Sequence, residues 1–230
     1  MKTSAGIFCR CLFRGICLAL LLASCTTTHR SPDAGYPGDR IYAVASWYGA
    51  DFNGRPTASG EVFNMYANTC AHRQYPFGTR LKVTHLSNGR TAECIVNDRG
   101  PFIEGRDIDL SYAVAKEIGV IGPGTSKVLL EVTGRDRSYI RQVKVQSPDR
   151  KGQFVIQVGA FTDMMNAVRL KAALGLKYDN VTIEETDLRG TVFHRVRLGT
   201  FKSFSRAYGV AEELGQEGYQ PIIVKSGLKV

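Results

Sequence analysis

Residues 79–98, TRLKVTHLSNGRTAECIVND, hold two strand patterns joined by a tight turn. Leu81 and Val83 alternate with polar residues, which is the period of a strand with one buried face. Asn88-Gly89 lies between the two patterns, and this dipeptide favours a two-residue turn because both positions tolerate positive φ. The stretch therefore predicts two strands that are joined by a tight turn.

These two strands belong to a longer region of short strands, residues 41–133. Similar apolar or alternating runs, separated by Gly, Pro, Asn and Asp, are Tyr42–Tyr48, Arg80–His85, Thr91–Val96 and Lys127–Val132. One helix interrupts them, with Asp109 or Ser111 as its expected N-cap and Gly119 as its end. Many short strands with glycine-rich turns predict a small closed barrel, because closure removes the unpaired edges of a sheet.

Residues 152–230 contain an internal repeat. Gly159-Ala160-Phe161 returns 40 residues later as Gly199-Thr200-Phe201, and each copy is followed at the same spacing by an alanine. Each copy follows a strand pattern and precedes a segment of helical period, after which another strand is expected. The order β-α-β-β-α-β in about 75 residues predicts one ferredoxin-like α+β domain.

The first 24 residues have the composition of an export signal. Positive residues precede an apolar run from Ile16 to Ala23, which is shorter than the roughly 20 residues that span a bilayer. Leu22-Ala23-Ser24-Cys25 resembles a lipobox, which implies cleavage before Cys25, a lipid on its sulfur and a membrane anchor facing the periplasm. A plain secretory signal with a chance cysteine is the alternative. Thr26, where inner-membrane retention usually has Asp, implies transfer to the outer membrane.

Residues 25–40 are polar and contain Pro and Gly, so they are expected to form a flexible tether next to the lipid. Loss of residues 1–24 would lower the formal net charge from +9 to +6, because three basic and no acidic residues leave. This charge suits anionic cell-wall polymers, although solubility alone also explains it. Basic residues gather in residues 134–151, which is typical of a solvated linker, with contact to anionic wall polymer as the alternative. An exported chain without exposed aromatic runs among its arginines is a poor match to a nucleic-acid binder.

Cys70 and Cys94 are the two cysteines that remain once the signal is removed and Cys25 carries lipid. Disulfides persist in the periplasm, so we expect these two residues to be bridged, with two buried free thiols as the alternative. No cysteine and histidine spacing of the zinc type occurs, so the sequence supports neither a metal site nor another cofactor.

Residues 46–111 hold the densest group of unusual motifs. These are Ser46-Trp47-Tyr48-Gly49, Thr57-Ala58-Ser59-Gly60-Glu61, Ala71-His72, Pro76-Phe77-Gly78-Thr79, Asn97-Asp98-Arg99-Gly100-Pro101-Phe102 and Ile108-Asp109-Leu110-Ser111. In this order they resemble the rare lipoprotein A family, and the repeated glycine motifs resemble the SPOR domain that this family often carries. The resemblance covers about residues 41–133 and 152–226. It implies a mainly β, six-stranded double-psi β-barrel, followed by a small α+β SPOR domain.

The resemblance also implies a lytic transglycosylase that cuts peptidoglycan strands stripped of stem peptides. Such a reaction needs a carboxylic acid to protonate the glycosidic oxygen. The resulting carboxylate can deprotonate the 6-hydroxyl of the sugar, so one carboxyl can serve in both steps. Asp98 matches this role, and Glu61 and His72 match positions that orient substrate or tune Asp98. Without the resemblance, Asp98 would be taken as a turn residue, His72 as a structural histidine and Glu61 as a surface residue.

Candidate glycan-binding residues come from both domains. Trp47 and Tyr48 can stack on a sugar ring, although Trp47 fits the barrel core equally well, and Arg99 either touches substrate or fixes its loop. In the second domain the candidates lie on sheet strands, with Phe161 alternatively part of the core: Gln157, Phe161, Arg195 and Arg197. The alternative to a division-site enzyme is a non-catalytic wall-binding protein that scaffolds or loosens the septal wall. A monomer is expected in either case.

Overall fold

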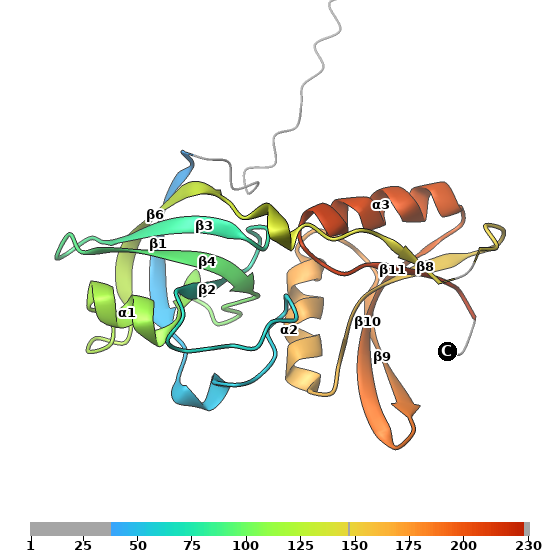
Figure 1. Cartoon of the computed structure of the whole chain (residues 1–230), viewed down its shortest axis with the longest axis horizontal. Helices are drawn as coiled ribbons and strands as arrows, with labels where there is room; N and C mark the ends of the chain where they lie inside the picture. Colours follow the sequence, from blue (N-terminus) through green and yellow to red (C-terminus); the bar gives the residue numbers. More distant parts are fainter. Residues whose placement is uncertain (1–37, 147, 228–230) are drawn as a thin grey trace, which may run out of the picture. The chain divides into compact units, whose positions relative to one another are not determined.

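The computed structural model describes residues 38–146 and 148–227, which form two domains in sequence (Figure 1). The expected signal segment, Cys25 and residues 25–37 of the expected tether lie outside the described residues. The first domain contains β1 (Arg40–Trp47), η1 (Ala50–Phe52), β2 (Thr69–His72), β3 (Thr79–His85), β4 (Thr91–Asp98), β5 (Ile108–Leu110), α1 (Tyr112–Ile118) and β6 (Ser126–Arg135). The second contains η2 (Arg137–Tyr139), β7 (Lys144–Val145), β8 (Phe154–Phe161), α2 (Met164–Gly175), β9 (Val181–Leu188), β10 (Thr191–Phe201), α3 (Phe204–Gln216) and β11 (Ile222–Lys225).

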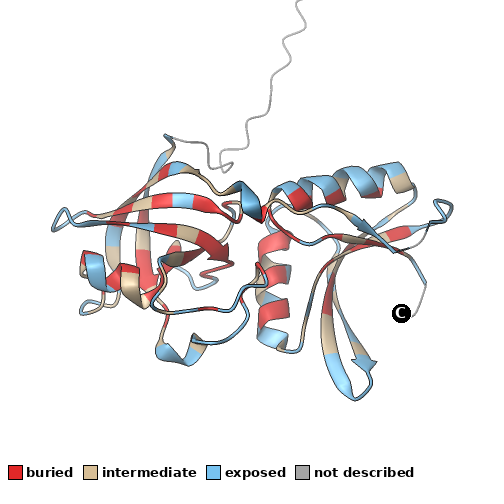
Figure 2. Ribbon diagram, in the orientation of Figure 1, coloured by how far each residue is buried: buried red, intermediate tan, exposed pale blue. Residues whose placement is uncertain are grey.

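The first domain is a closed six-stranded barrel, as expected from the sequence and the family resemblance, and its strand order is β1-β5-β2-β4-β3-β6. The strands β1 and β6 pair antiparallel, whereas β1 with β5 and β2 with β4 pair parallel. Alternate side chains of each long strand point inward, which follows from the two-residue period of a strand. On β3, for example, Leu81 and Val83 are fully buried while Arg80 is exposed. Figure 2 shows this alternation as red and paler bands along the barrel strands.

The helix α1 begins at Ser111, whose hydroxyl accepts a hydrogen bond from the backbone N–H of Val114 at 3.3 Å. It ends at Gly119, which has a left-handed backbone (φ 83°) that a side chain would disfavour. The N-cap is therefore Ser111, and the alternative prediction of Asp109 as the cap is wrong. Its carboxylate instead accepts hydrogen bonds from the Ser46 hydroxyl and the Arg106 guanidinium.

The second domain has the predicted order β8-α2-β9-β10-α3-β11 around a sheet arranged β7-β11-β8-β10-β9. The glycine repeat is explained by close packing at the end of β8. A Cβ on Gly159 would lie 2.7 Å from the Phe161 ring and 2.8 Å from Leu170 of α2. Gly199 has a left-handed backbone (φ 63°) next to Phe201, so the second copy also excludes a side chain.

The linker between the domains is shorter than the predicted range of residues 134–151. The strand β6 extends to Arg135, and η2 follows at once. The two residues of β7 then pair parallel with β11, so they join the sheet of the second domain as an edge strand. Within the described residues, no helix is both long and apolar enough to cross a membrane.

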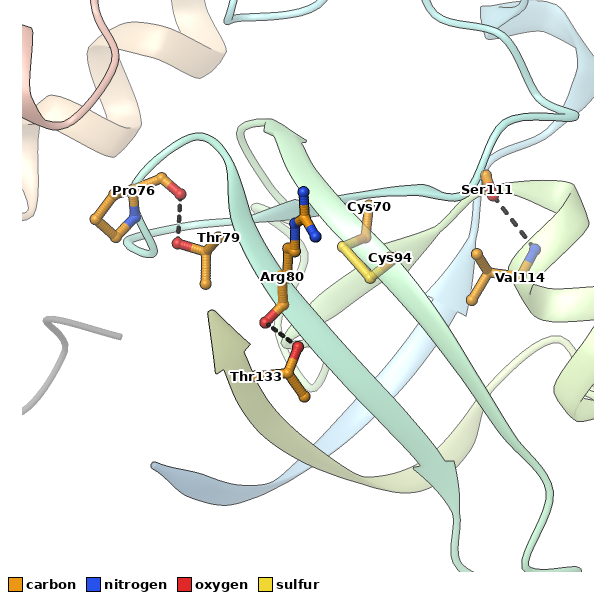
Figure 3. The surroundings of a disulfide bond; sticks show 8 residues. All are labelled: Cys70, Pro76, Thr79, Arg80, Cys94, Ser111, Val114 and Thr133. Atoms are coloured by element: carbon orange, nitrogen blue, oxygen red, sulfur yellow. Dashed lines mark hydrogen bonds between the residues drawn. A yellow bond between two sulfur atoms is a disulfide. The ribbon is translucent and has the colours of Figure 1, made fainter. Parts of the chain in front are cut away.

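A disulfide joins Cys70 of β2 to Cys94 of β4, with the two Cα atoms 5.9 Å apart (Figure 3). Both cysteines are completely buried in the barrel core. The structure therefore places a covalent link between the two strands whose ends carry His72 and Asp98.

Candidate active site

Two candidate catalytic residues lie at the ends of neighbouring strands. His72 is the last residue of β2 and Asp98 is the last residue of β4. Because β2 and β4 run parallel, with Ala71 paired to Asp98, their carboxyl ends meet at one edge of the barrel. The fold thus brings together two residues that are separated by a long stretch of sequence.

The Asp98 carboxyl group is buried and held by three hydrogen bonds. Its Oδ1 accepts from the backbone N–H groups of Ala58 and Arg99, each at 2.8 Å, and its Oδ2 accepts from the hydroxyl of Tyr48 at 3.1 Å. Burial raises the pKa of Asp98, and this effect outweighs the hydrogen bonds and the charge of Arg169, which lower it. A carboxyl with a raised pKa can hold a proton closer to neutral pH, which a general acid requires.

The loop that contains Glu61 is fastened to the end of β4. Thr57 and Glu61 close a turn through a backbone hydrogen bond of 2.7 Å, which requires the left-handed backbone of Gly60 (φ 91°) between them. The exposed Glu61 accepts a 2.9 Å hydrogen bond at Oε2 from the side-chain amide of Asn97. Glu61 is therefore linked to Asp98 through the residue immediately before it.

The surroundings of His72 favour a neutral imidazole. Its Nδ1 accepts hydrogen bonds from the backbone N–H groups of Gln74 (3.2 Å) and Tyr75 (3.0 Å), and its ring stacks on Tyr75 at 4.0 Å. Burial, followed by the charges of Arg99 and Arg73, lowers the pKa of His72 to about 3. Because Nδ1 is an acceptor, the single ring proton lies on Nε2. His72 is thus suited to donate a hydrogen bond rather than to shuttle protons.

The aromatic pair at the end of β1 occupies two different environments. The Trp47 ring is half-buried and packs edge-to-face on Tyr112 at 5.9 Å. Tyr48 is buried, its ring lies 4.9 Å from Phe63, and its hydroxyl points at Asp98. This position favours an interaction with the carboxyl over the sugar stacking that the sequence suggests for Tyr48.

Arg99 is only 2% exposed, so it is among the most buried large side chains of the protein. Its guanidinium donates to the hydroxyl of Tyr219 at 2.6 Å and to the backbone oxygen of Tyr75 at 3.0 Å, and it lies 3.7 Å from the centroid of the Phe77 ring. These contacts favour the loop-fixing alternative over substrate contact, because Nε and Nη1 donate to protein oxygens, whereas Nη2 is buried without a hydrogen-bond partner among the described residues.

A small cavity is lined by Asp98, and a larger cavity that shares Tyr48 and Arg169 with it is not. The smaller, of about 40 Å³, is lined by Asp98 and Tyr48 together with Asn166 and Arg169 of α2. A volume near that of one water molecule is too small for a sugar ring. The larger, of about 430 Å³, is lined by Trp47, Tyr48 and the Gly100-Pro101 turn, and it has the size of a ligand site.

Three of the four candidates in the second domain converge on one groove. Gln157, Arg195 and Arg197 line a depression of about 320 Å³, which also includes residues of β7. Phe161 lies elsewhere, half-buried against the core and lining a separate groove. Lys144 and Gln146 of this groove were not predicted, because their basic, polar segment suggests a linker. Arg169 has no periodic signal in the sequence, and Asn97 was noted only as part of the motif that contains Asp98.

Comparison with family models assigns both domains. Residues 41–130 match the model described as lytic transglycolase, and residues 151–225 match the model described as SPOR domain. The fold and site therefore define a two-domain protein with a lytic transglycolase barrel and a SPOR domain. Among the described residues, no group of three or more His, Cys, Asp or Glu side chains is arranged to hold a metal ion.

Curated relatives match across both domains. The chain is 35% identical to the endolytic peptidoglycan transglycosylase RlpA of Vibrio cholerae, over 79% of this chain and 67% of that protein. It is 39% identical to the protein of the same name from Campylobacter jejuni, over 74% of this chain and 67% of that protein. The chain belongs to the rare lipoprotein A (RlpA) family. The solved RlpA SPOR domain from Pseudomonas aeruginosa is 31% identical, covers 31% of this chain and 97% of that one, and has a TM-score of 0.29.

Proposed function

We propose that the protein is an endolytic peptidoglycan transglycosylase whose barrel cleaves glycan strands and leaves 1,6-anhydro-muramic ends. The observation that carries this proposal is the buried Asp98 carboxyl, with its raised pKa, at the edge of a barrel that matches the lytic transglycolase model. Relatives of this chain are named for the same activity.

The proposed reaction uses Asp98 in both steps. Its protonated carboxyl donates a proton to the glycosidic oxygen as the bond from that oxygen to the anomeric carbon breaks. The resulting carboxylate then accepts the proton of the sugar's own 6-hydroxyl, whose oxygen bonds to the anomeric carbon. No external water enters the product, so a second carboxylate that activates water is not needed. Asp98 ends the cycle protonated, as it began.

Glu61 and His72 have supporting roles in this proposal. The neutral His72 can donate a hydrogen bond from Nε2 to a sugar oxygen without gaining or losing a proton. Glu61 holds Asn97, and with it the end of β4, through the hydrogen bond to the Asn97 amide. We assign substrate orientation to His72 and placement of Asp98 to Glu61.

The second domain is proposed to bind strands that lack stem peptides and to concentrate the protein at the division septum. Its basic groove, which contains Arg195 and Arg197, supports contact with anionic glycan. We also propose that a lipid on Cys25 anchors the chain to the outer membrane, with both domains facing the periplasm, and that the protein acts as a monomer. These points rest on the family and on the sequence motif at residues 22–25.

The test compares the purified wild-type chain with Asp98→Asn and with Asp51→Asn, which removes an exposed carboxylate elsewhere in the barrel. Each protein is incubated with amidase-treated peptidoglycan, and the products are analysed by mass spectrometry. We expect anhydro ends from the wild type and Asp51→Asn, and none from Asp98→Asn although it still binds the glycan. Binding by all three proteins without any product, under conditions where a control enzyme cleaves, would instead establish a wall-binding scaffold.

A further inference from the structure

The two oxygens of the Asp98 carboxyl group have different environments. Oδ1 accepts two backbone N–H hydrogen bonds, from Ala58 and Arg99, each at 2.8 Å. A carboxylate oxygen has about two lone-pair directions, so these donors fill Oδ1. A proton on Oδ1 would displace one of them and leave a buried N–H without a partner, which is costly. Oδ2 is therefore the oxygen that can carry and exchange a proton.

We propose that Tyr48 is a positioning residue, whose hydroxyl occupies one lone-pair direction of Asp98 Oδ2 and aims the other at the substrate. The inference rests on the proposed function, because it assigns the proton-carrying atom in that reaction. The 3.1 Å hydrogen bond from Tyr48 Oη to Oδ2 is its direct support. Tyr48 contacts the acid rather than the reacting sugar, so its effect acts through Asp98.

The hydroxyl of Tyr48 is held in place by the barrel. Tyr48 is 8% exposed, its backbone N–H donates to the oxygen of Leu110 at 3.0 Å, and its ring packs on Phe63 and Phe52 with centroids 4.9 and 5.7 Å away. The phenol can donate to a carboxylate oxygen, and equally to the remaining lone pair of Oδ2 when its proton points at the substrate. The same contact can therefore persist in both steps of the reaction.

Charged groups on several elements act on this pair. Burial and the charges of Asp98 and Asp109 of β5 raise the pKa of Tyr48, so the phenol stays protonated at neutral pH. Burial raises the pKa of Asp98, while the two backbone donors, Arg169 of α2 and the Tyr48 hydroxyl lower it. Loss of the Tyr48 hydroxyl removes one of the effects that lower the pKa of Asp98, so this pKa should rise further.

The test uses Tyr48→Phe in the full chain, which keeps the ring and removes one oxygen atom. Tyr66→Phe is the matched control, because Tyr66 is an exposed tyrosine of the barrel. We expect Tyr48→Phe to lower kcat on amidase-treated glycan on the order of tenfold, the effect of losing one hydrogen bond to a charged group, with KM unchanged. The pKa of Asp98 would be measured by a pH titration of carboxyl NMR signals, with Asp98→Asn used to assign the Asp98 signal. We expect a higher titration midpoint for Asp98 in Tyr48→Phe than in the wild type, and no change in Tyr66→Phe.

A Tyr48→Phe variant with the wild-type kcat and the wild-type Asp98 midpoint would overturn the inference while leaving the proposed function intact. A variant that changes KM alone would also overturn it, because that result indicates substrate contact. If the wild type itself forms no anhydro ends, the proposed function and the role of Tyr48 in it fall together. Thermal unfolding of Tyr48→Phe near the wild-type temperature excludes loss of the fold as the cause.

Discussion

Loss of the disulfide between Cys70 and Cys94 should lower the free energy of unfolding of the barrel by about 3.5 kcal/mol. The two cysteines are 24 residues apart, and the chain-entropy relation for a loop of that length gives this value at 25 °C. Both sulfurs are completely buried. Replacing the cysteines would therefore also remove packed volume, and the comparison must separate that loss from loss of the covalent link.

Trp47 gives a probe that is specific to the barrel, because it is the single tryptophan of the chain and lies in β1. We would follow its fluorescence during urea unfolding of the oxidised wild type, the reduced wild type and the Cys70→Ala/Cys94→Ala double variant. The reduced protein keeps both sulfur atoms, so the difference in the free energy of unfolding between the oxidised and reduced proteins measures the effect of the covalent link alone. A difference below about 1 kcal/mol would refute the entropic reasoning. Two free thiols from these residues in the unfolded, unreduced protein would refute the bridge itself.

Two further predictions concern His72 and the groove of the second domain. The pKa of His72 is about 3 in the folded protein and 6.5 in the unfolded protein, so the unfolded state binds more protons between these pH values. Lowering the pH through this range should therefore lower the free energy of unfolding by up to about 1.4 kcal/mol per pH unit. His72→Gln should flatten that slope in denaturant titrations, and equal slopes in both proteins would contradict the assignment. In a co-sedimentation assay with insoluble glycan, Lys144→Gln and Arg197→Gln should each lower the binding affinity roughly threefold to tenfold at low salt, and less at high salt. Lys116→Gln in α1 is the control, and equal effects of all three variants would indicate a general charge effect.

Much of the fold follows from short-range patterns. The alternation at Leu81 and Val83 predicts β3, whereas β8 and β10 each run through the glycine motif that the sequence pattern places after the strand. The short strands predict a closed barrel, and the family resemblance adds its six strands and double-psi topology, whereas neither gives the strand order β1-β5-β2-β4-β3-β6. The strand β7 escaped prediction because two exposed residues carry no alternation, and their pairing with β11 depends on a segment far along the chain.

The sequence names residues for the candidate site but does not give their contacts. Asp98, Glu61 and His72 are candidates through the family resemblance, and the parallel pairing of β2 with β4 brings two of them to one edge. The Tyr48 hydroxyl is directed at Asp98 by ring packing across the barrel, which a single sequence does not encode locally. Likewise, Arg99 meets Tyr219 120 positions later, so only the folded chain distinguishes its loop-fixing role from substrate contact.

Because β7 is part of the second sheet, the covalent connection between the barrel and that sheet consists of residues 136–143. Even fully extended, eight residues span at most about 29 Å, and contacts such as the Arg99–Tyr219 hydrogen bond add to this connection. Under the proposed function, a glycan strand bound in the groove would therefore meet the barrel only within a short distance of its point of attachment. The length of this connector would then limit the distance between the sugars bound in the groove and the bond that the barrel cleaves. Inserting residues between Arg141 and Lys144 would increase that distance.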